Sequence, residues 1–268
     1  MSVDVRWLAS PNHTRGRAGV PVIALVHHRM VGTLRGTDAT FVGATRMAST
    51  TFGVGYECGQ PGHPSVRAHV HQYVHLDDQA WGNGNWDASG AWDDRYPTGN
   101  LNARTISIEH HDNGHLPGSD PRKGLVRDDV IEASIALDRL LLSGDVVAWR
   151  EAGISWRSTD APERIARELR AIEPRPHTIV DPHYISGRLK PYCWRPWAGD
   201  RTGFPQVRFL GALGASEDDM LIIVNASAFP EPRRWRVAAG TTLHGYDPAQ
   251  PGKVIRSMTF AAASSARA

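Results

Sequence analysis

The sequence predicts an α/β protein with a small C-terminal β-module, and three observations support this prediction. A continuous apolar run over residues 20–28 is typical of a strand that is covered on both faces. Apolar residues at helical spacing over residues 128–143, followed by Gly144, predict an amphipathic helix with a defined end. After residue 200, short apolar runs alternate with Pro and Gly, which predicts several short strands.

The first part of the chain is predicted to contain strands and one short helix. The first apolar run ends in His27 and His28, and chemistry often lies where such strands end. Thr37 is positioned to cap a short helix, and residues 49–59 predict a strand that runs into a Gly-rich turn. Residues 66–76 alternate between small apolar and polar side chains, which predicts a half-buried strand.

A strand that carries a carboxylate follows a long loop. Residues 82–103 are rich in Gly, Asn and Asp and predict the loop, and loops of this length are usually functional or disordered. Residues 104–111 predict the strand, in which Ile106 and Ile108 face one way and Glu109 faces the other. Glu109 therefore points away from the apolar pair.

A third helix and a further strand complete the predicted α/β region. The helix is expected over about residues 161–172, with Asp160 and Glu163 in the spacing of a capping box. Residues 177–186 then return to a strand pattern.

The C-terminal part is predicted to be a separate β-module. Residues 211–219 have the composition of a linker. Short strands are expected within residues 220–227, 233–248 and 253–260. Residues 261–268 are expected to be disordered.

Composition argues against several classes of protein. With 41% hydrophobic and 22% charged residues the chain has the composition of a globular protein, and a net charge of +2 argues against a dedicated nucleic-acid binder. The N-terminal residues lack the pattern of a secretory signal, and no apolar run approaches the ~18 residues that a membrane span requires. We therefore expect a chain that begins in the cytoplasm and has neither nucleic acid nor membrane as a partner.

A strand-end histidine, a late histidine and a nearby cysteine form a candidate set of zinc ligands. His27, His183 and Cys193 offer nitrogen and sulfur, and a catalytic zinc site leaves its fourth position to water. Taken singly, a histidine after an apolar run is more often a hydrogen-bonded core residue, and a buried cysteine is usually a small apolar one. His28 is expected to face away from His27, in a packing role or in a hydrogen bond to a ligand. Cys58 has no role that the sequence supports.

Five segments occur in the order found in a known family. They are IALVHHRMVGTLRGT, ASTTFGVGYECG, HQYVHLDDQAWGNGN, NARTISIEHH and DPHYISGRLKPYC. Together they resemble the type 2 N-acetylmuramoyl-L-alanine amidases, a zinc amidase fold shared with peptidoglycan recognition proteins and many phage endolysins. The resemblance implies a central mixed β-sheet flanked by helices, with the site in a groove at the strand ends.

The resemblance also implies a role for individual residues. It makes His27, His183 and Cys193 the zinc ligands. It makes Glu109 the acid that takes a proton from the zinc-bound water and passes it to the leaving amine. Lys190 would stabilise the oxyanion that forms when water attacks the amide carbonyl.

Three positions depart from the family pattern. Lys190 lies three residues before Cys193 rather than two, so Arg188 is an alternative cation. Phe52 stands where many members carry a tyrosine that acts in catalysis or contacts substrate. The histidine that is frequent after Trp81 is absent.

Substrate contacts are expected from Phe52, His71, Trp81 and Trp86. Tryptophan rings are flat apolar platforms that suit sugar rings, although a tryptophan is more often part of a core. A rival metal site is conceivable, because His69, His71 and His75 share one strand face. Arg67 on the same face fits a solvated or substrate-facing surface better.

We therefore expect a zinc amidase that cleaves peptidoglycan between N-acetylmuramic acid and L-alanine. Residues 1–205 would be the catalytic domain and residues 214–268 a small β domain that binds cell wall or serves oligomerisation or stability. A phage endolysin, acting on the wall after release from the host cytoplasm, is the expected setting. The alternatives are a non-catalytic peptidoglycan-binding protein of the same fold, an intracellular muropeptide-recycling amidase and a virion-associated lysin; the oligomeric state is left open.

Overall fold

The computed structural model describes residues 3–30, 32–44, 47–57, 68–86, 99–112, 126–175, 178–180, 206–215, 234–237, 242–246, 254–259 and 264–267. Within these residues, no helix is both long enough and apolar enough to span a membrane.

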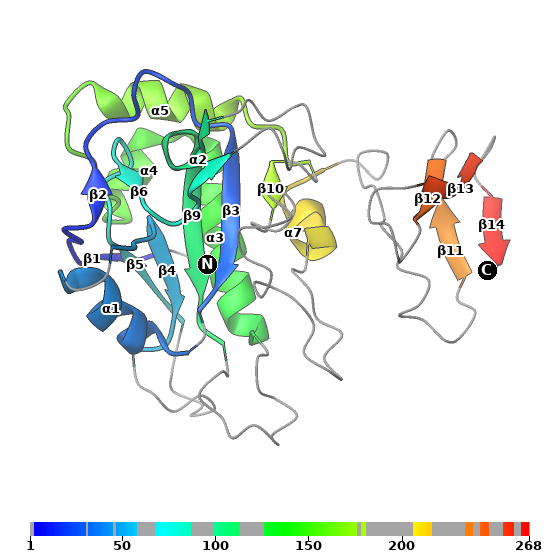
Figure 1. Ribbon diagram of the computed structural model, residues 1–268, viewed down its shortest axis with the longest axis horizontal. Coiled ribbons are helices and arrows are strands. Elements are labelled where there is room, and N and C mark those ends of the chain that lie inside the picture. The colour runs from blue at the N-terminus through cyan, green and yellow to red at the C-terminus, as the bar shows by residue number, and fades with distance from the viewer. Residues whose placement is uncertain are drawn as a thin grey trace.

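A six-stranded mixed sheet forms the centre of the structure, with strand order β1-β5-β4-β9-β3-β10 (Figure 1). The strands are β1 (Val5–Trp7), β5 (His69–Gln72), β4 (Phe52–Gly55), β9 (Thr105–His110), β3 (Ala24–Arg29) and β10 (Ile179–Val180). Strands β4 and β5 pair antiparallel, whereas the other neighbouring strands pair parallel. The predicted mixed sheet, flanked by helices, is confirmed.

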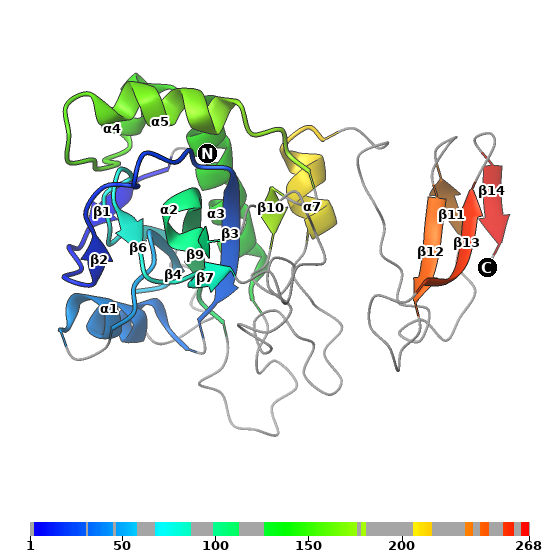
Figure 2. The same ribbon diagram turned by 45° about the horizontal axis from the view of Figure 1, so that its top comes forward.

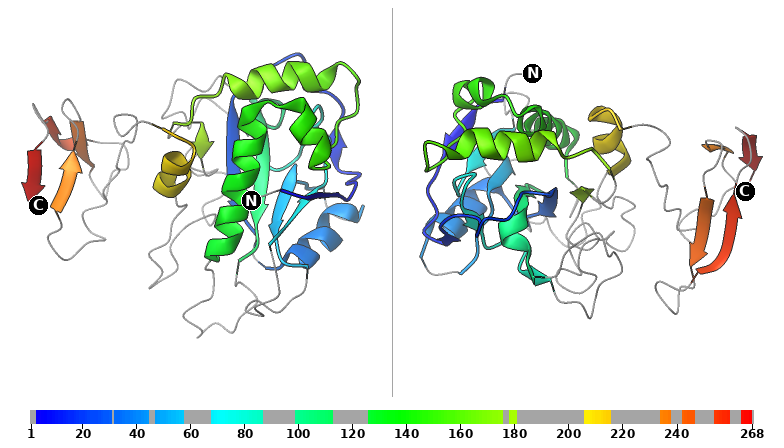
Figure 3. Two further views of the ribbon diagram at one scale, coloured as in Figure 1. Left: turned by 180° about the vertical axis from the view of Figure 1, so that it is seen from behind. Right: turned by 90° about the horizontal axis from the view of Figure 1, so that it is seen from above.

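One face of the sheet is covered by helices α3 (Asp128–Ser143), α4 (Val146–Glu151) and α5 (Ala161–Arg170) (Figure 3, left). Trp149 of α4 and Ile165 of α5 join the same buried apolar cluster as Ile108 of the sheet. Helix α7 (Gln206–Ala212), which the sequence pattern did not predict, adds Phe209 to this cluster. The main core therefore lies between the sheet and this helical layer.

The ends of α3 and α5 differ in how well local sequence predicts them. Helix α3 ends at Gly144, which adopts the left-handed conformation (φ 57°) that favours glycine, as expected. The predicted capping box of α5 does not form, because the Asp160 side chain makes no cap hydrogen bond. It accepts a hydrogen bond from the Ser158 hydroxyl instead.

The opposite face of the sheet is covered by helix α1 (Leu34–Val42), the short helix α2 (Leu101–Arg104) and the strand pair of β2 (His13–Thr14) and β6 (Gln79–Ala80). Figures 1 and 2 show that α2 and α3 lie on opposite sides of the sheet. Helix α1 begins one turn earlier than predicted, because the Thr33 side chain caps it by accepting from the Gly36 amide. Since both faces are covered, His71 of β5 is as buried as Val70, so the prediction of a half-buried strand is wrong.

The predicted long loop over residues 82–103 contains short regular elements. It includes β7 (Asn85–Trp86), which pairs with β8 (Gly99–Asn100), and it runs into α2. Residues 87–98 lie outside the described part of the chain.

Four strands of the C-terminal part form two separate pairs. Strand β11 (Arg234–Val237) pairs antiparallel with β14 (Ser264–Arg267), and β12 (Thr242–Tyr246) with β13 (Val254–Thr259). Strands within residues 233–248 and 253–260 are confirmed, and residues 220–227 lie outside the described residues. The tail that was expected to be disordered contains β14.

Candidate active site

A row of laterally paired residues crosses the sheet on one face. The register places His28 beside Glu109 and Glu109 beside Gly53. Gly53 in turn lies beside His71, and His71 beside Arg6. Lateral partners in a sheet point to the same face, so these residues share one surface. They are called the lateral row below.

His28 and Glu109 form a close titratable pair in the lateral row. His28 is fully buried, and its Nε2 lies 2.5 Å from Asn83 Oδ1. Its Nδ1 lies 3.9 Å from Glu109 Oε1, which is longer than a hydrogen bond. Because the Glu109 side chain keeps 13% of its surface exposed, the carboxylate borders solvent while His28 does not.

His27 faces the other side of the sheet. It lies beside Ile108 in the register, and its Nε2 is 3.2 Å from Asp138 Oδ2 of α3, with both side chains fully buried. Its ring also packs against Phe209, at 4.7 Å between ring centres. The expectation that His27 and Glu109 share one site is therefore not met, and His28 takes the orientation expected of His27.

A closed polar cluster surrounds His27 beneath α3. His110 Nε2 lies 2.8 Å from Ser134 Oγ, and its Nδ1 lies 2.7 Å from the His28 carbonyl oxygen. Burial, together with the nearby His27, lowers the pKa of His110 to about 3. Burial raises the pKa of the Asp138 carboxyl, and His27 acts in the opposite direction. All four side chains, His27, His110, Ser134 and Asp138, are fully buried.

His71 is held between two carboxylates at the other side of the lateral row. Its Nδ1 lies 2.9 Å from Asp38 Oδ1 and its Nε2 3.2 Å from Glu57 Oε1. The Arg6 guanidinium donates to the same Glu57 oxygen at 2.7 Å, and this hydrogen bond lowers the pKa of Glu57. His71 is therefore fully buried with a carboxylate near each ring nitrogen, and its contact with substrate stays a prediction.

A tyrosine hydroxyl that sequence reasoning missed lies over the centre of the row. A Cβ added at Gly53 would be 2.9 Å from Tyr73 Oη and 2.9 Å from Leu34 Cδ1, so only glycine leaves room for the ring. Tyr73 donates to Asp38 Oδ1 at 2.6 Å. Burial, then Asp38, then Glu109 raise the pKa of the Tyr73 hydroxyl above its usual 10.0. The only sequence signal was that Tyr73 shares a strand face with His71.

The other expected substrate contacts have different outcomes. Phe52 is fully buried beside Ile108 in the core, and its contact with substrate stays a prediction. Trp81 is half-buried and donates from Nε1 to Thr14 Oγ1 at 2.9 Å. Trp86 lies in β7, and its side chain is outside the described residues.

Four residues with expected roles lie outside the described residues, namely His183, Arg188, Lys190 and Cys193. Cys58 lies outside them as well. In the part of the chain that is described, no group of three or more His, Cys, Asp or Glu side chains is arranged to hold a metal ion. This includes the rival set of His69, His71 and His75, in which the His75 ring stacks on Trp7 instead.

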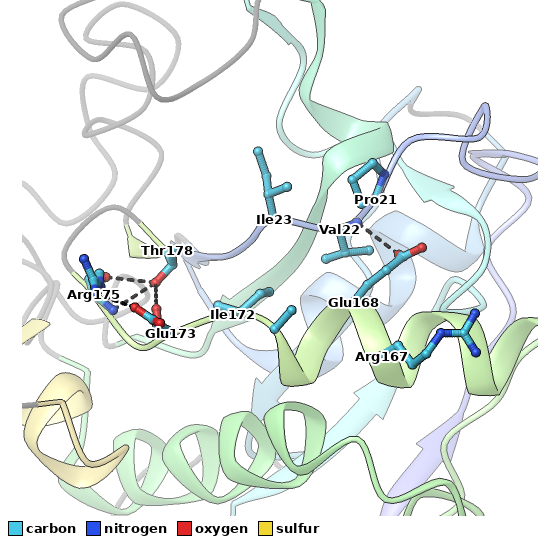
Figure 4. Close-up of a pocket in the computed structure, with 10 residues that line it drawn as sticks. Pro21, Val22, Ile23, Arg167, Glu168, Ile172, Glu173, Arg175 and Thr178 are labelled. Atoms are coloured by element: carbon cyan, nitrogen blue, oxygen red, sulfur yellow. Dashed lines mark hydrogen bonds and ion pairs between the residues drawn. The ribbon is translucent and has the colours of Figure 1, made fainter.

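A surface pocket of about 560 Å³ lies away from the lateral row, between the segment before β3 and helix α5 (Figure 4). Polar groups in it bind one another: Glu168 Oε2 accepts from the Val22 amide at 3.1 Å, and Thr178 Oγ1 donates to the Glu173 carbonyl at 2.6 Å. The pocket adjoins the start of β3, whereas His28 is near the end of that strand. It has no part in the chemistry of the His28–Glu109 pair.

Comparisons with known proteins give only distant similarities. No family model and no curated protein matches this chain. Among solved structures, the chain is similar to a selenomethionine derivative of AmpD, with 16% identity, a TM-score of 0.49, and coverage of 80% of this chain and 99% of that one. It is also similar to AmpDh3 from Pseudomonas aeruginosa in complex with anhydromuramic pentapeptide, with 17% identity, a TM-score of 0.40, and coverage of 73% and 62%.

A third similar structure is the N-acetylmuramyl-L-alanine amidase AmiD from E. coli, in complex with the substrate anhydro-N-acetylmuramic acid-L-Ala-D-gamma-Glu-L-Lys. The identity is 19% and the TM-score 0.31, with coverage of 53% of this chain and 48% of that one. Because all of these TM-scores lie below 0.5, the function of this chain must be inferred from its own residues.

Proposed function

We propose that this chain is a zinc-dependent amidase that hydrolyses the amide bond between N-acetylmuramic acid and L-alanine in peptidoglycan. The observation that carries the proposal is the lateral pairing of His28 with Glu109, whose Nδ1 and Oε1 atoms are 3.9 Å apart. Metal-assisted hydrolysis of an amide needs a metal-binding side chain and a proton-transferring carboxylate next to each other. The two residues come from segments that resemble the first-ligand strand and the acid-bearing strand of the type 2 amidases.

The side chains available in this region fit zinc. We propose His28 as the first ligand in place of His27, because only His28 faces Glu109. His183 and Cys193 remain the other proposed ligands, on the basis of the resemblance alone. Imidazole nitrogen and thiolate sulfur are donors that zinc prefers, and bound zinc would lower the pKa of a water to about 7 and polarise the amide carbonyl.

Glu109 carries the proton transfers in this proposal. Its carboxylate takes one proton from the attacking water as the new C–O bond forms, and delivers it to the amine nitrogen as the C–N bond breaks. The partial exposure of the Glu109 side chain lets it meet both water and substrate. Lys190 or Arg188 would stabilise the oxyanion between these two steps.

The pairing of a proton-transferring acid with a metal-ligating residue favours an enzyme over a non-catalytic peptidoglycan receptor. We further propose that the chain acts as a phage endolysin on the cell wall after release from the host cytoplasm, with residues 214–268 binding the wall. The self-contained strand pairs β11–β14 and β12–β13 are compatible with such a module.

The proposal is tested by measuring metal content and muropeptide cleavage on the purified chain. Wild type is expected to hold about one zinc per chain and to release the stem peptide from N-acetylmuramic acid. Glu109→Gln should keep the zinc and lose at least about 100-fold in turnover, since a positioned acid–base group contributes 10²–10⁴-fold. Wild type that leaves the bond intact, or Glu109→Gln that cleaves as fast as wild type, would overturn the proposal.

A further inference from the structure

A chain of hydrogen bonds leads from His28 to the backbone of helix α2. His28 Nε2 lies 2.5 Å from Asn83 Oδ1, and Asn83 Nδ2 donates to Thr105 Oγ1 at 2.6 Å. Thr105 Oγ1 donates to the Leu101 carbonyl oxygen at 2.7 Å. His28, Asn83 and Thr105 are all buried, so water does not compete for these groups.

The last acceptor in this series of hydrogen bonds, the Leu101 carbonyl, determines which atom donates in each of them. The Leu101 carbonyl can only accept, so it takes the single hydroxyl proton of Thr105. The Thr105 oxygen is then left to accept from the Asn83 amide group, which turns the amide oxygen of Asn83 toward His28. An amide oxygen cannot donate, so the hydrogen between the two residues belongs to His28 Nε2. In a neutral imidazole the lone pair is then on Nδ1, the nitrogen on the Glu109 side.

We propose that Asn83 is a positioning residue, which holds His28 in the Nε2-protonated tautomer and so presents Nδ1 for metal binding beside Glu109. The metal-binding part of this inference rests on the proposed function, whereas the tautomer can be measured without any metal. Ligating histidines commonly donate their other N–H to such a partner, and losing it typically costs 10–100-fold in metal affinity.

The loop that carries Asn83 is itself anchored. The backbone amides of Asn83 and Gly84 both donate to Asn102 Oδ1, at 2.8 and 3.0 Å. At the preceding residue, a Cβ added to Gly82 would lie 2.9 Å from the Ser49 carbonyl oxygen, so the backbone there is packed too tightly for a side chain. These contacts fix the backbone on both sides of Asn83, and the amide is therefore presented to His28 in one orientation.

Two substitutions at residue 83 separate positioning from mere loss of structure. Asn83→Leu has a similar branched shape and removes the acceptor for His28, whereas Asn83→Asp keeps an acceptor oxygen for His28 and loses only the N–H that donates to Thr105. Asn12→Leu is the matched control, because Asn12 is another buried asparagine, whose Nδ2 donates to the Gly43 carbonyl away from the lateral row.

The first measurement is the tautomer in metal-free protein, by long-range ¹H–¹⁵N NMR of ¹⁵N-histidine-labelled chains. The His28 signals are assigned by their absence in His28→Gln. We expect the Nε2-protonated form in wild type, in Asn83→Asp and in Asn12→Leu, and a mixture of tautomers in Asn83→Leu. A wild-type His28 protonated on Nδ1, or an unchanged tautomer in Asn83→Leu, overturns the inference.

The second measurement is zinc affinity by chelator competition. Asn83→Leu should bind zinc about 10–100-fold more weakly than wild type, and Asn12→Leu should stay within about threefold of wild type. Asn83→Asp, which keeps the acceptor for His28, should bind zinc more tightly than Asn83→Leu. If wild type binds zinc and Asn83→Leu has the same zinc affinity as Asn12→Leu, the inference about Asn83 fails and the proposed function stands. If wild type binds no zinc, the proposed function fails and the metal-binding role of Asn83 fails with it.

Discussion

Replacing His27 and His28 one at a time by leucine should produce opposite defects, although the two residues are identical and adjacent. His27 faces Asp138 in the core, and His28 faces Glu109. We expect His27→Leu to lose stability while keeping its affinity for zinc. We expect His28→Leu to lose zinc while remaining the more stable of the two variants.

The stability loss in His27→Leu follows from the charge that it leaves behind. His27 Nε2 is 3.2 Å from Asp138 Oδ2, and neither side chain is exposed. Removing one partner of such a buried pair costs about 3–5 kcal/mol. Holding a carboxyl with an ordinary pKa of 3.8 neutral at pH 7 costs about 4 kcal/mol, which agrees with that range. The melting temperature should fall by roughly 6–20 °C in a domain of about 200 residues.

The expected zinc defect in His28→Leu follows from the loss of one proposed ligand. Four-ligand structural zinc sites bind with about 10–16 kcal/mol, so one ligand accounts for roughly 3–4 kcal/mol, or on the order of a 100- to 1,000-fold loss of affinity. The unpaired Asn83 oxygen adds about 1–3 kcal/mol of destabilisation, which is less than the cost in His27→Leu.

The assay is thermal unfolding of the metal-free variants, followed by zinc competition on each folded variant. As a control, His27→Leu combined with Asp138→Leu should regain most of the lost stability, because an apolar pair can replace a buried polar pair at little cost. If His27→Leu abolishes zinc binding and His28→Leu retains it, the assignment of faces is refuted.

Further predictions concern packing, titration and domain organisation. Gly55→Ala should lower the free energy of unfolding by about 1–3 kcal/mol, because the new Cβ would overlap the His111 side chain; denaturant unfolding identical to wild type would contradict this. An ultraviolet absorbance titration should find Tyr56 and Tyr73 still protonated above pH 10.0 in the folded chain, because burial and a bound carboxylate raise the pKa of each. In the unfolded chain both hydroxyls release their protons near pH 10.0, so the free energy of unfolding should decrease as the pH rises above 10.0. Ionisation of Tyr56 and Tyr73 near pH 10.0 in the folded protein would contradict this expectation. Deleting residues 216–268 should spare muropeptide hydrolysis and weaken binding to whole walls, since α7 stays attached to the core; loss of hydrolysis would place the domain boundary elsewhere.

Local sequence was enough to predict those helices and strands whose signals lie within a few residues of one another. The 3.6-residue apolar spacing and Gly144 predicted α3 with its end. The apolar run before His27 and the alternation around Ile108 predicted β3 and β9. The order of the family-like segments predicted the mixed sheet and drew attention to Glu109.

Tertiary structure alone decided which histidine meets Glu109. Side chains alternate along a strand, so the sequence shows that His27 and His28 face opposite ways, but not which of them faces the acid. That choice depends on the register of β3 against β9, which pairs His28 with Glu109 across a long separation in the chain. Register is set by which faces the helices and loops cover, and a slip of one residue would exchange the two histidines. The same covering of both faces buries the side chains of His71 and Phe52, which the sequence pattern alone did not predict.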